Sequence, residues 1–307
     1  MRGRRFKDRC AHKIMLGSCL LVSGLTPLII FGLYWKSRPI LAANRLWRDL
    51  LFSFSWHPAR GEFGLAGFIA GSLWVTAGAM MIAVPLSLLT AVYLSEYCRR
   101  NVRGWVQPVM DVLGGIPPVV YGAWGILVVV PFVRDIAKPF LKTTWPFFPF
   151  LSNNETGFSV LAGSLVLAIM ICPTITSIAG EVLAAVPSEI RESSLALGAT
   201  RWQTIKHPVW KDARGGLAAA ILLGLSRAFG ETMAVLMVAG CQLRTCPSSI
   251  FDTAYPLPAL IANTYGEMMS IPAYEAAVFL AALVLLVVTI LFNAVGWGIL
   301  IRVEGSK

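Results

Sequence analysis

Apolar residues along the chain are gathered into long runs, and polar and basic residues are concentrated in the segments between them. Each run reaches or exceeds the roughly 20 residues that an α-helix needs to cross a bilayer. The pattern therefore predicts an all-α integral membrane protein with six transmembrane helices. The predicted helices cover residues 14–34, 63–95, 106–133, 158–180, 215–240 and 276–301.

The composition favours a membrane protein and argues against several other classes. Of the 307 residues, 56% are hydrophobic and 14% are charged, whereas soluble domains carry about 25% charged residues. The net charge of +10 lies mostly in loops between apolar runs, so nucleic-acid binding is not expected. The dipeptide Gly-Lys is absent, which excludes a P-loop for ATP. The cysteines and histidines show no metal-site spacing, so no metal or cofactor is expected.

The distribution of Lys and Arg predicts the orientation of the chain. The N-terminal segment, the loops 96–104 and 181–214, and the C-terminal tail hold 16 of these residues, whereas the loops on the other side hold nine. Cytoplasmic loops usually carry the excess, so both termini are predicted in the cytoplasm. The first run, residues 14–34, is longer than the 7–15-residue core of a signal peptide and is interpreted as a membrane helix.

The predicted topology also separates the cysteines by compartment. Cys241 and Cys246 fall on the outer side, where disulfides form, whereas Cys10 and Cys98 are expected to stay reduced inside. A bridge between Cys241 and Cys246 and a pair of free thiols are both compatible with their spacing.

The fifth predicted helix carries two charges, Arg227 and Glu231, flanked on each side by an uncharged stretch of twelve residues. Residues four positions apart lie on one face of an α-helix. A cation near the bilayer centre costs at least about 2.5–3.5 kcal/mol by insertion scales, so intramembrane charges usually have a function. Two interpretations remain: a self-neutralising pair that helps helices pack, or a pair that contacts solute on a transport pathway.

Prolines interrupt two of the predicted helices. Pro117 and Pro118 are adjacent in the third, and Pro173 lies inside the fourth. A proline has no N–H, so each one leaves a helical carbonyl without its donor. Such carbonyls must be satisfied by neighbouring helices or by a cavity. An ordinary kink and a broken helix that lines a pathway are both compatible with Pro117-Pro118.

The segment 181–214 is the longest polar stretch between predicted helices. Ser188 favours a helix start as N-cap, and Gly198 favours the end of that helix. Thr200 then favours the start of a second helix as its N-cap. The sequence therefore predicts a cytoplasmic helical hairpin centred on a glycine.

Several segments, in this order, resemble the ABC importer permeases. Glu192-Ser-Ser-x-x-x-Gly198 is similar to the Glu-Ala-Ala-x-x-x-Gly coupling loop of that family, with two serines in place of the alanines. The ending Gly-Glu-Thr-Met-Ala-Val at 230–235 is more similar to the PstC-type than to the PstA-type subunit of the phosphate branch. Other segments that resemble this branch are Leu-Ser-Glu-Tyr at 94–97, Gly-Ile-Pro-Pro-Val-Val-Tyr-Gly at 115–122, Ile-Met-Ile-Cys-Pro-Thr-Ile-Thr-Ser at 169–177, Ala-Leu-Gly-Ala-Thr-Arg-Trp at 196–202 and Arg-Ala-Phe at 227–229.

The resemblance implies the type I ABC importer permease fold and a role as half of a membrane pathway for inorganic phosphate, not an enzyme. It implies as partners a second permease subunit of PstA type, two ATPase subunits, an extracytoplasmic phosphate-binding protein and membrane lipid. It implies location in the plasma membrane of a prokaryote, which is the inner membrane in a Gram-negative cell. The expected units are residues 1–62, a permease domain at 63–302, and a tail at 303–307.

The intramembrane charges and helix breaks, together with the resemblance, assign roles to the residues singled out above. Arg227 and Glu231 are expected on the solute pathway, with the helix breaks at Pro117, Pro118 and Pro173 nearby. The residues expected in the ATPase coupling loop are Glu192, Gly198, Ala199 and Thr200.

Three alternative functions are weighed against phosphate import. A permease for another oxyanion, such as sulfate or molybdate, belongs to the same class. A proton-coupled secondary transporter would use Arg227 and Glu231 as ion-coupled residues, but such folds usually contain inverted repeats, and none is evident here. A membrane scaffold that recruits a sensor would not move solute. ATP-dependent uptake with a co-purifying ATPase separates these alternatives.

Overall fold

Two helices at the centre of the bundle, α3 (Ala66–Val92) and α8 (Val160–Ala184), make the most extensive helix contact in the described part of the chain. A glycine permits this contact, because a Cβ added at Gly78 would lie 2.4 Å from Oγ of Ser164. That hydroxyl donates to the carbonyl of Val75 at 3.1 Å. The computed structural model describes residues 2–42, 47–144, 152–242, 246–266 and 270–304.

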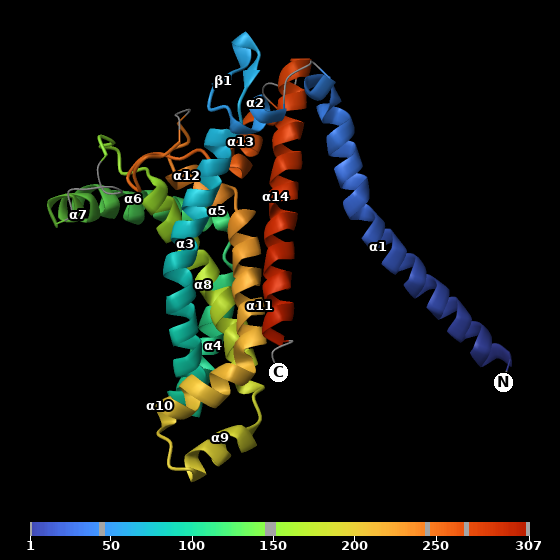
Figure 1. Ribbon diagram of the computed structural model, residues 1–307, viewed down its shortest axis with the longest axis vertical. Helices are drawn as coiled ribbons and strands as arrows, with labels where there is room; N and C mark the ends of the chain where they lie inside the picture. Colours follow the sequence, from blue (N-terminus) through green and yellow to red (C-terminus); the bar gives the residue numbers. More distant parts are fainter. Residues whose placement is uncertain (1, 43–46, 145–151, 243–245, 267–269, 305–307) are drawn as a thin grey trace.

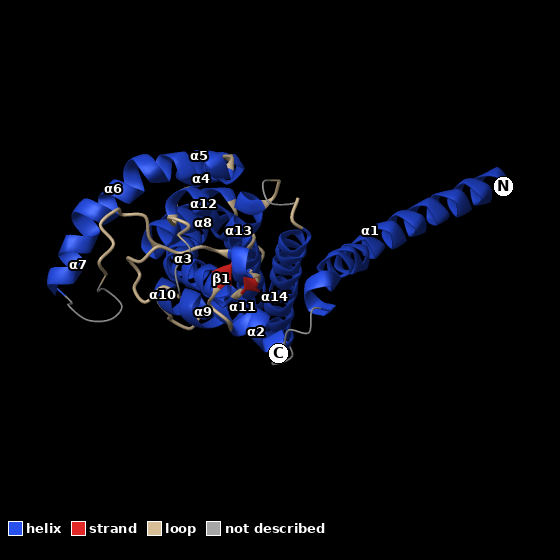
Figure 2. Ribbon diagram, turned by 90° about the horizontal axis from the view of Figure 1, so that it is seen from above, coloured by secondary structure: helices blue, strands red, loops and turns tan. Residues whose placement is uncertain are grey.

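Further long helices lie beside this pair. α11 (Trp210–Phe229) contacts both α8 and α14 (Pro272–Glu304). α1 (Arg2–Ala42) touches α14 near one end and then extends away from the bundle, as Figures 1 and 2 show. Lys36 Nζ and Glu275 Oε1, 2.8 Å apart, join these two helices where they meet.

The chain between α3 and α8 forms a broken helix. Its first part, α4 (Arg100–Gly115), runs along the bundle beside α8. The helical segments that follow the break form an arc leading to one side of the bundle (Figure 2). They are α5 (Pro118–Trp124), the π-helical turn Gly125–Val129, α6 (Val130–Phe132), the π-helical turn Val133–Ala137 and α7 (Lys138–Thr144).

The two ends of the bundle carry different short elements (Figure 1). The last residues of α14 lie toward one end, which is called the hairpin end here. Its elements are the π-helical turn Tyr93–Tyr97, α9 (Ser188–Ala196), α10 (Arg201–Thr204) and the π-helical turn Ile205–Val209. Toward the opposite end lie α2 (Trp47–Phe52), β1 (Trp56–His57), the 3-10 turn Pro58–Arg60, β2 (Glu62–Phe63), α12 (Met233–Val238) and α13 (Leu257–Thr264).

The small sheet β1–β2 corrects the all-α prediction, because the chain is mostly but not entirely helical. The two strands are antiparallel, with Trp56 opposite Phe63. Trp56 is buried and packs edge-on against the rings of Phe63, Phe68 and Tyr274. Two-residue strands leave too short an alternation to be recognised in the sequence.

The number of apolar spans also differs from the prediction. Five helical segments of the described chain are long and apolar enough to cross a membrane. The predicted helix over 215–240 is not among them. α11 carries four charged residues, and the helix ends at Phe229 before α12 begins at Met233. α11 nevertheless packs within the bundle between apolar helices. The five segments are Ala11–Ala42, Ala66–Tyr97, Pro118–Thr144, Val160–Ala184 and Pro272–Gly298.

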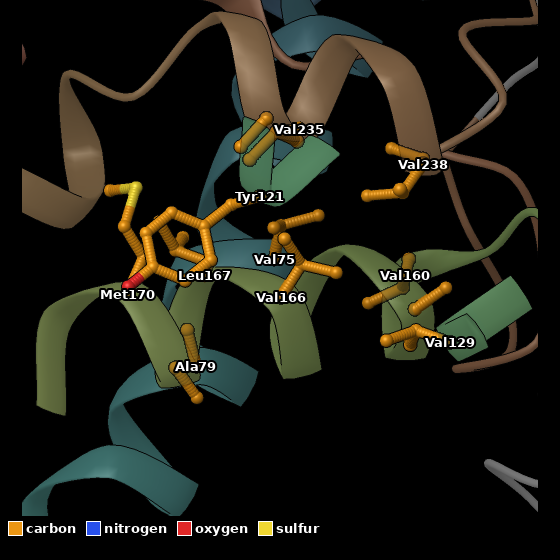
Figure 3. Close-up of a cluster of buried hydrophobic side chains, with 14 of the residues drawn as sticks. Val75, Ala79, Tyr121, Val129, Val160, Val166, Leu167, Met170, Val235 and Val238 are labelled. Atoms are coloured by element: carbon orange, nitrogen blue, oxygen red, sulfur yellow. The ribbon is translucent and has the colours of Figure 1, made fainter. Parts of the chain in front are cut away.

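The main hydrophobic core lies between α3, α5, α8 and α12. Figure 3 shows part of it, with Tyr121 of α5 beside Met170 of α8. Val75 and Val166 are completely buried in the same cluster. This core fixes the arc that starts at α5 against the central helices, and so positions the break that precedes it.

Candidate functional site

The break between α4 and α5 leaves two carbonyl groups that need donors from elsewhere. In a continuous helix the carbonyls of Leu113 and Gly114 would accept from the backbone nitrogens of residues 117 and 118, which are prolines here. The carbonyl of Leu113 instead accepts from the backbone nitrogen of Ile116 at 3.3 Å and from the hydroxyl of Tyr121 at 2.7 Å. The carbonyl of Gly114 accepts from Nη2 of Arg227 at 3.1 Å. The Arg227 side chain thus replaces the donor that Pro118 lacks. Of the two interpretations left open by the sequence, the structure has a broken helix, because α4 ends at Gly115 and α5 begins at Pro118.

Arg227 joins three helices at this point. Besides Gly114 on α4, it contacts α8, because Nη1 donates to Oγ1 of Thr174 at 2.7 Å. Pro173 lies next to this site, since a Cβ at Gly114 would be 3.9 Å from Cβ of Pro173. The guanidinium is half-buried, and within the described residues it forms no ion pair with a carboxylate. Its positive charge is therefore held by neutral groups, and no carboxylate of the described residues neutralises it.

The depth of Arg227 in the bundle follows from the contacts of its helix. The ring of Phe229 lies 5.3 Å from that of Phe292, and Ser226 Oγ donates to Oδ1 of Asn293 at 2.5 Å. Both partners lie in the interior of the long helix α14. Arg227 is thus placed well inside the bundle, away from its two ends.

The structure corrects the expected relationship between Arg227 and Glu231. α11 ends at Phe229, so the two residues do not share a helix face. Oε1 of Glu231 accepts from the backbone nitrogens of Thr232, Met233 and Ala234 at 3.1–3.3 Å. A continuing helix would have used those N–H groups for its own carbonyls, so this carboxylate stabilises the break and the start of α12. The self-neutralising pair is wrong, and the charges have separate partners.

The hairpin end has the two short helices that the sequence predicts. Gly198 has a φ of 82° between α9 and α10, and Thr200 caps α10 in a reciprocal capping box with Gln203. The start of α9 lies one residue earlier than expected, because Pro187 occupies the N-cap position and Ser188 the first helical position. Glu192 and Thr200 are exposed, and Ala199 is half-buried.

Two adjacent residues at the end of α3 hold this hairpin. Glu96 is only 8% exposed and accepts from Nε and Nη2 of Arg191 on α9 at 3.1 and 2.8 Å. The next residue, Tyr97, lies under the guanidinium of Arg201 on α10, 5.2 Å from the ring centre. Arg191 also donates to the carbonyls of Leu183 and Val186 at the end of α8. The hairpin is thereby linked to both central helices.

Sequence reasoning did not single out the pair Glu96–Arg191. The residues are 95 positions apart, so no local spacing signals their contact. The available signal was weaker: a carboxylate at the end of a long apolar run, next to basic residues in the following polar segment. A carboxylate in such a pattern is normally expected at the membrane surface, and the pattern does not indicate which residue it contacts.

The hairpin also exposes large apolar side chains. Leu195, Leu197 and Trp202 are 49%, 90% and 54% exposed, and they lie on either side of Gly198. Exposed apolar residues beside polar ones are typical of a surface that meets another protein or the membrane.

The sequence that forms these two sites matches the model of a known protein family. The model for the binding-protein-dependent transport system inner membrane component matches residues 83–297, which include both the Arg227 site and the hairpin. The chain is a member of this family of transport permeases.

Curated relatives cover almost the whole permease. The probable ABC transporter permease protein YqgH of Bacillus subtilis is 36% identical, over 95% of this chain and 88% of that protein. The phosphate transport system permease protein PstC of Mesorhizobium japonicum is 33% identical, over 98% and 93%. That of Xylella fastidiosa is 34% identical, over 90% and 85%.

Solved structures share the fold of the permease. A chain of the bacterial alginate ABC transporter superposes with a TM-score of 0.56 over 94% of this chain and 98% of that chain, at 14% identity. A chain of the methionine transporter MetNI has a TM-score of 0.52 over 78% and 94%, at 19% identity. The permease therefore has the ABC importer permease fold.

Pro173, beside the Arg227 site, does not break its helix, because it lies inside α8, which continues to Ala184. Cys241 and Cys246 are free thiols, so the bridge between them is not formed in the structure. Burial raises the pKa of Cys241 to about 12, whereas Cys246 is exposed. Among the residues that the structure describes, no group of three or more His, Cys, Asp or Glu could hold a metal ion.

Proposed function

We propose that this permease forms half of the membrane pathway for inorganic phosphate in an ATP-driven importer. Its partners in this proposal are a second permease subunit, two ATPase subunits and an extracytoplasmic phosphate-binding protein. The observation that carries the proposal is Arg227, a cation well inside the bundle that neutral groups hold in place. Several relatives that span most of the chain are named as phosphate permeases, which supports the choice of solute.

Arg227 has the chemistry to contact a passing oxyanion. A guanidinium has five N–H donors and stays charged when buried. The two hydrogen bonds to Thr174 and Gly114 use part of this set and fix the plane of the group. The other donors can contact two oxygens of phosphate in a bidentate arrangement. The hydrogen-bond partners of Arg227, Thr174 and the carbonyl of Gly114, are neutral, so an anion that binds Arg227 does not have to displace a carboxylate.

Glu231 has a different role in the proposal. Its Oε1 fixes the start of α12, and its Oε2 forms no hydrogen bond within the described residues. A free carboxylate oxygen can accept the O–H of a phosphate that retains a proton, and sulfate has no such proton near neutral pH. Glu231 is half-buried, so the repulsion between its carboxylate and a fully ionised anion is partly screened by solvent but still unfavourable. Glu231 therefore disfavours fully ionised anions.

The hairpin is the proposed contact for an ATPase subunit. It exposes Leu195, Leu197 and Trp202. Arg191 joins it to the end of α3 through Glu96 and to α8 through the carbonyl of Leu183. Movement of the hairpin would therefore reach α8, whose Thr174 holds Arg227. Glu192, Gly198, Ala199 and Thr200 are proposed to belong to this coupling surface.

Uptake by the complete transporter in vesicles tests the proposal. We expect labelled phosphate to accumulate only with ATP and the binding protein, and to be unaffected by a proton ionophore. Excess sulfate or molybdate should not compete. Accumulation driven by a proton gradient without ATP would favour a secondary transporter, and preferential uptake of sulfate would reassign the solute. Complex formation with an ATPase but no uptake of any oxyanion would favour a scaffold.

A further inference from the structure

A basic hollow at the hairpin end is separate from the Arg227 site and from the hairpin contacts. It is a shallow depression of about 570 Å³, open to the surface, where the π-helical turn Ile205–Val209 joins α11. Among the described residues that line it there is no acidic side chain. The lining residues are Lys206, His207, Pro208, Trp210, Lys211 and Arg214.

Arg214 in this hollow has an unfilled hydrogen-bonding requirement. Its Nε and Nη2 are buried and have no hydrogen-bond partner within the described chain. Buried N–H groups are almost always paired, and an unpaired one calls for a missing partner. A guanidinium with two adjacent free N–H groups matches two oxygens of a phosphate group. The missing partner therefore has the chemistry of a phosphate or a similar oxyanion.

The backbone brings the other cations to the same place. Pro208 cannot donate to the carbonyl one turn earlier, and the chain forms a π-helical turn there. Lys206 within that turn and Lys211 just after it line one hollow with Arg214. Lys206 and Lys211 are exposed and Arg214 is half-buried, so an anion bound between them would reduce the repulsion of their positive charges.

The position of the hollow favours a lipid as the source of the phosphate group. α11 enters the bundle directly from this hollow, and Trp210 in its lining is 40% exposed. Tryptophan is enriched at the level of lipid headgroups, and basic pockets between helices on the cytoplasmic side bind anionic headgroups. The sequence predicts this end as cytoplasmic from its excess of Lys and Arg.

We propose that this hollow binds the headgroup phosphate of an anionic phospholipid, with Arg214, Lys211 and Lys206 as its ligands. The site does not depend on the identity of the transported solute. Its occupant supplies the acceptors that Arg214 lacks and anchors the start of α11 at the membrane surface.

Lipid retention by the full-length permease tests this site. Native mass spectrometry compares protein released from nanodiscs of phosphatidylcholine with and without phosphatidylglycerol. We expect the wild-type protein to retain phosphatidylglycerol in preference to phosphatidylcholine, and the double variant Arg214→Gln, Lys211→Gln to retain it about tenfold less. Lys142→Gln on α7, an exposed lysine far from the hollow, is the matched control and should retain it like the wild type. The thermal unfolding midpoint in phosphatidylcholine discs identifies variants that fold.

If the double variant does not fold, Lys206→Gln with Lys211→Gln leaves Arg214 in place and should lower retention severalfold. Equal retention by the wild type and the folded variant would overturn the proposal. So would equal retention of the two lipids by the wild type. Inorganic phosphate is added in a separate arm: release of the bound lipid by phosphate at millimolar concentration would identify free phosphate as the ligand and overturn the lipid assignment. Unchanged retention supports the lipid.

Discussion

Arg227 donates to the carbonyl of Gly114 at 3.1 Å, and that carbonyl is the one that Pro118 leaves without a helical donor. The helix break and the intramembrane cation are therefore parts of one arrangement. Each provides what the other needs, because the carbonyl needs a donor and the guanidinium needs acceptors inside the bundle. This arrangement fixes the orientation of a charge whose remaining donors are free to contact a solute.

Thr174 is expected to be essential for holding Arg227 in this orientation. Thr174→Val keeps the shape of the side chain but removes the acceptor of Nη1, and a hydrogen bond to a charged group contributes about 1.5–3 kcal/mol. We expect phosphate uptake to fall by roughly tenfold or more while the protein still assembles. Thr174→Ser, which keeps the hydroxyl, is the control and should retain most of the uptake. Equal uptake by the Val and Ser variants would show that this hydrogen bond is dispensable.

Substitutions at Gly198 distinguish backbone strain in the hairpin from direct contact between residue 198 and the ATPase. Its φ of 82° disfavours residues with a side chain, but a Cβ there would meet nothing within 4 Å. Gly198→Ala should therefore destabilise the hairpin by about 1–2 kcal/mol through the backbone alone. Gly198→Asn should cost less, because asparagine adopts this conformation more readily.

The measurement for Gly198 is the ratio of phosphate transported to ATP hydrolysed. A lower ratio for Ala than for Asn supports a backbone effect on coupling. A ratio that instead falls with side-chain size, from Ala through Asn to Trp, would indicate that Gly198 directly contacts the ATPase. Normal coupled transport by Gly198→Trp would remove the hairpin from the coupling role.

The ion pair of Arg191 and Glu96 is predicted to transmit hairpin movement. Removing one partner of a buried pair costs roughly 3–5 kcal/mol, because it leaves the other charge unpaired. Glu96→Gln and Arg191→Gln should each lower the unfolding midpoint and reduce coupled uptake. Arg191→Lys keeps the charge but loses the planar fork, so it should recover little.

A double-mutant cycle on uptake and stability checks the Arg191–Glu96 pair. The double variant should be no worse than the more affected single variant, since the two residues act through one contact. Strictly additive losses would mean that they act separately.

Thiol labelling tests both topology and burial at the end opposite the hairpin. Cys246 is exposed, whereas burial raises the pKa of Cys241 to about 12. The thiolate is the reactive form, so Cys241 should react far more slowly near pH 8 than a thiol of ordinary pKa near 8.5. Its rate should rise about tenfold per pH unit, because its thiolate fraction increases up to that pKa.

In intact cells a membrane-impermeant maleimide should label Cys246 first and spare Cys98. Single-cysteine variants, analysed by mass, give the rates. Labelling of Cys98 with protection of Cys246 would invert the orientation, and equal rates for Cys241 and Cys246 would contradict the burial of Cys241.

Local signals predicted the local parts of the structure. Two adjacent prolines predicted a kink or a break after α4, and a threonine after a glycine predicted the cap of α10, because each depends on a few neighbouring residues. The relationship between Arg227 and Glu231 was not predictable in this way. Helical spacing places them on one face, but Glu231 binds the N–H groups that would continue the helix. The side chain competes with the backbone, and spacing alone does not show which one wins.

Contacts between distant segments were beyond local reasoning. Glu96 and Arg191, or Gly114 and Arg227, are brought together by the packing of α3, α4 and α11 around α8. The sequence shows which residues need partners, such as an intramembrane arginine and a freed carbonyl. It does not show that each is the partner of the other.

The most direct test of the account is phosphate uptake by transporters that carry Arg227→Lys or Arg227→Met, with assembly checked by co-purification of the other subunits. Arg227→Met should abolish uptake, because the pathway loses its cation. Arg227→Lys keeps the charge but cannot hold Gly114, Thr174 and two phosphate oxygens at once, so uptake should stay well below the parent. If Arg227→Met assembles and takes up phosphate at the parent rate, Arg227 is a structural cap of the helix break and not a contact for the anion.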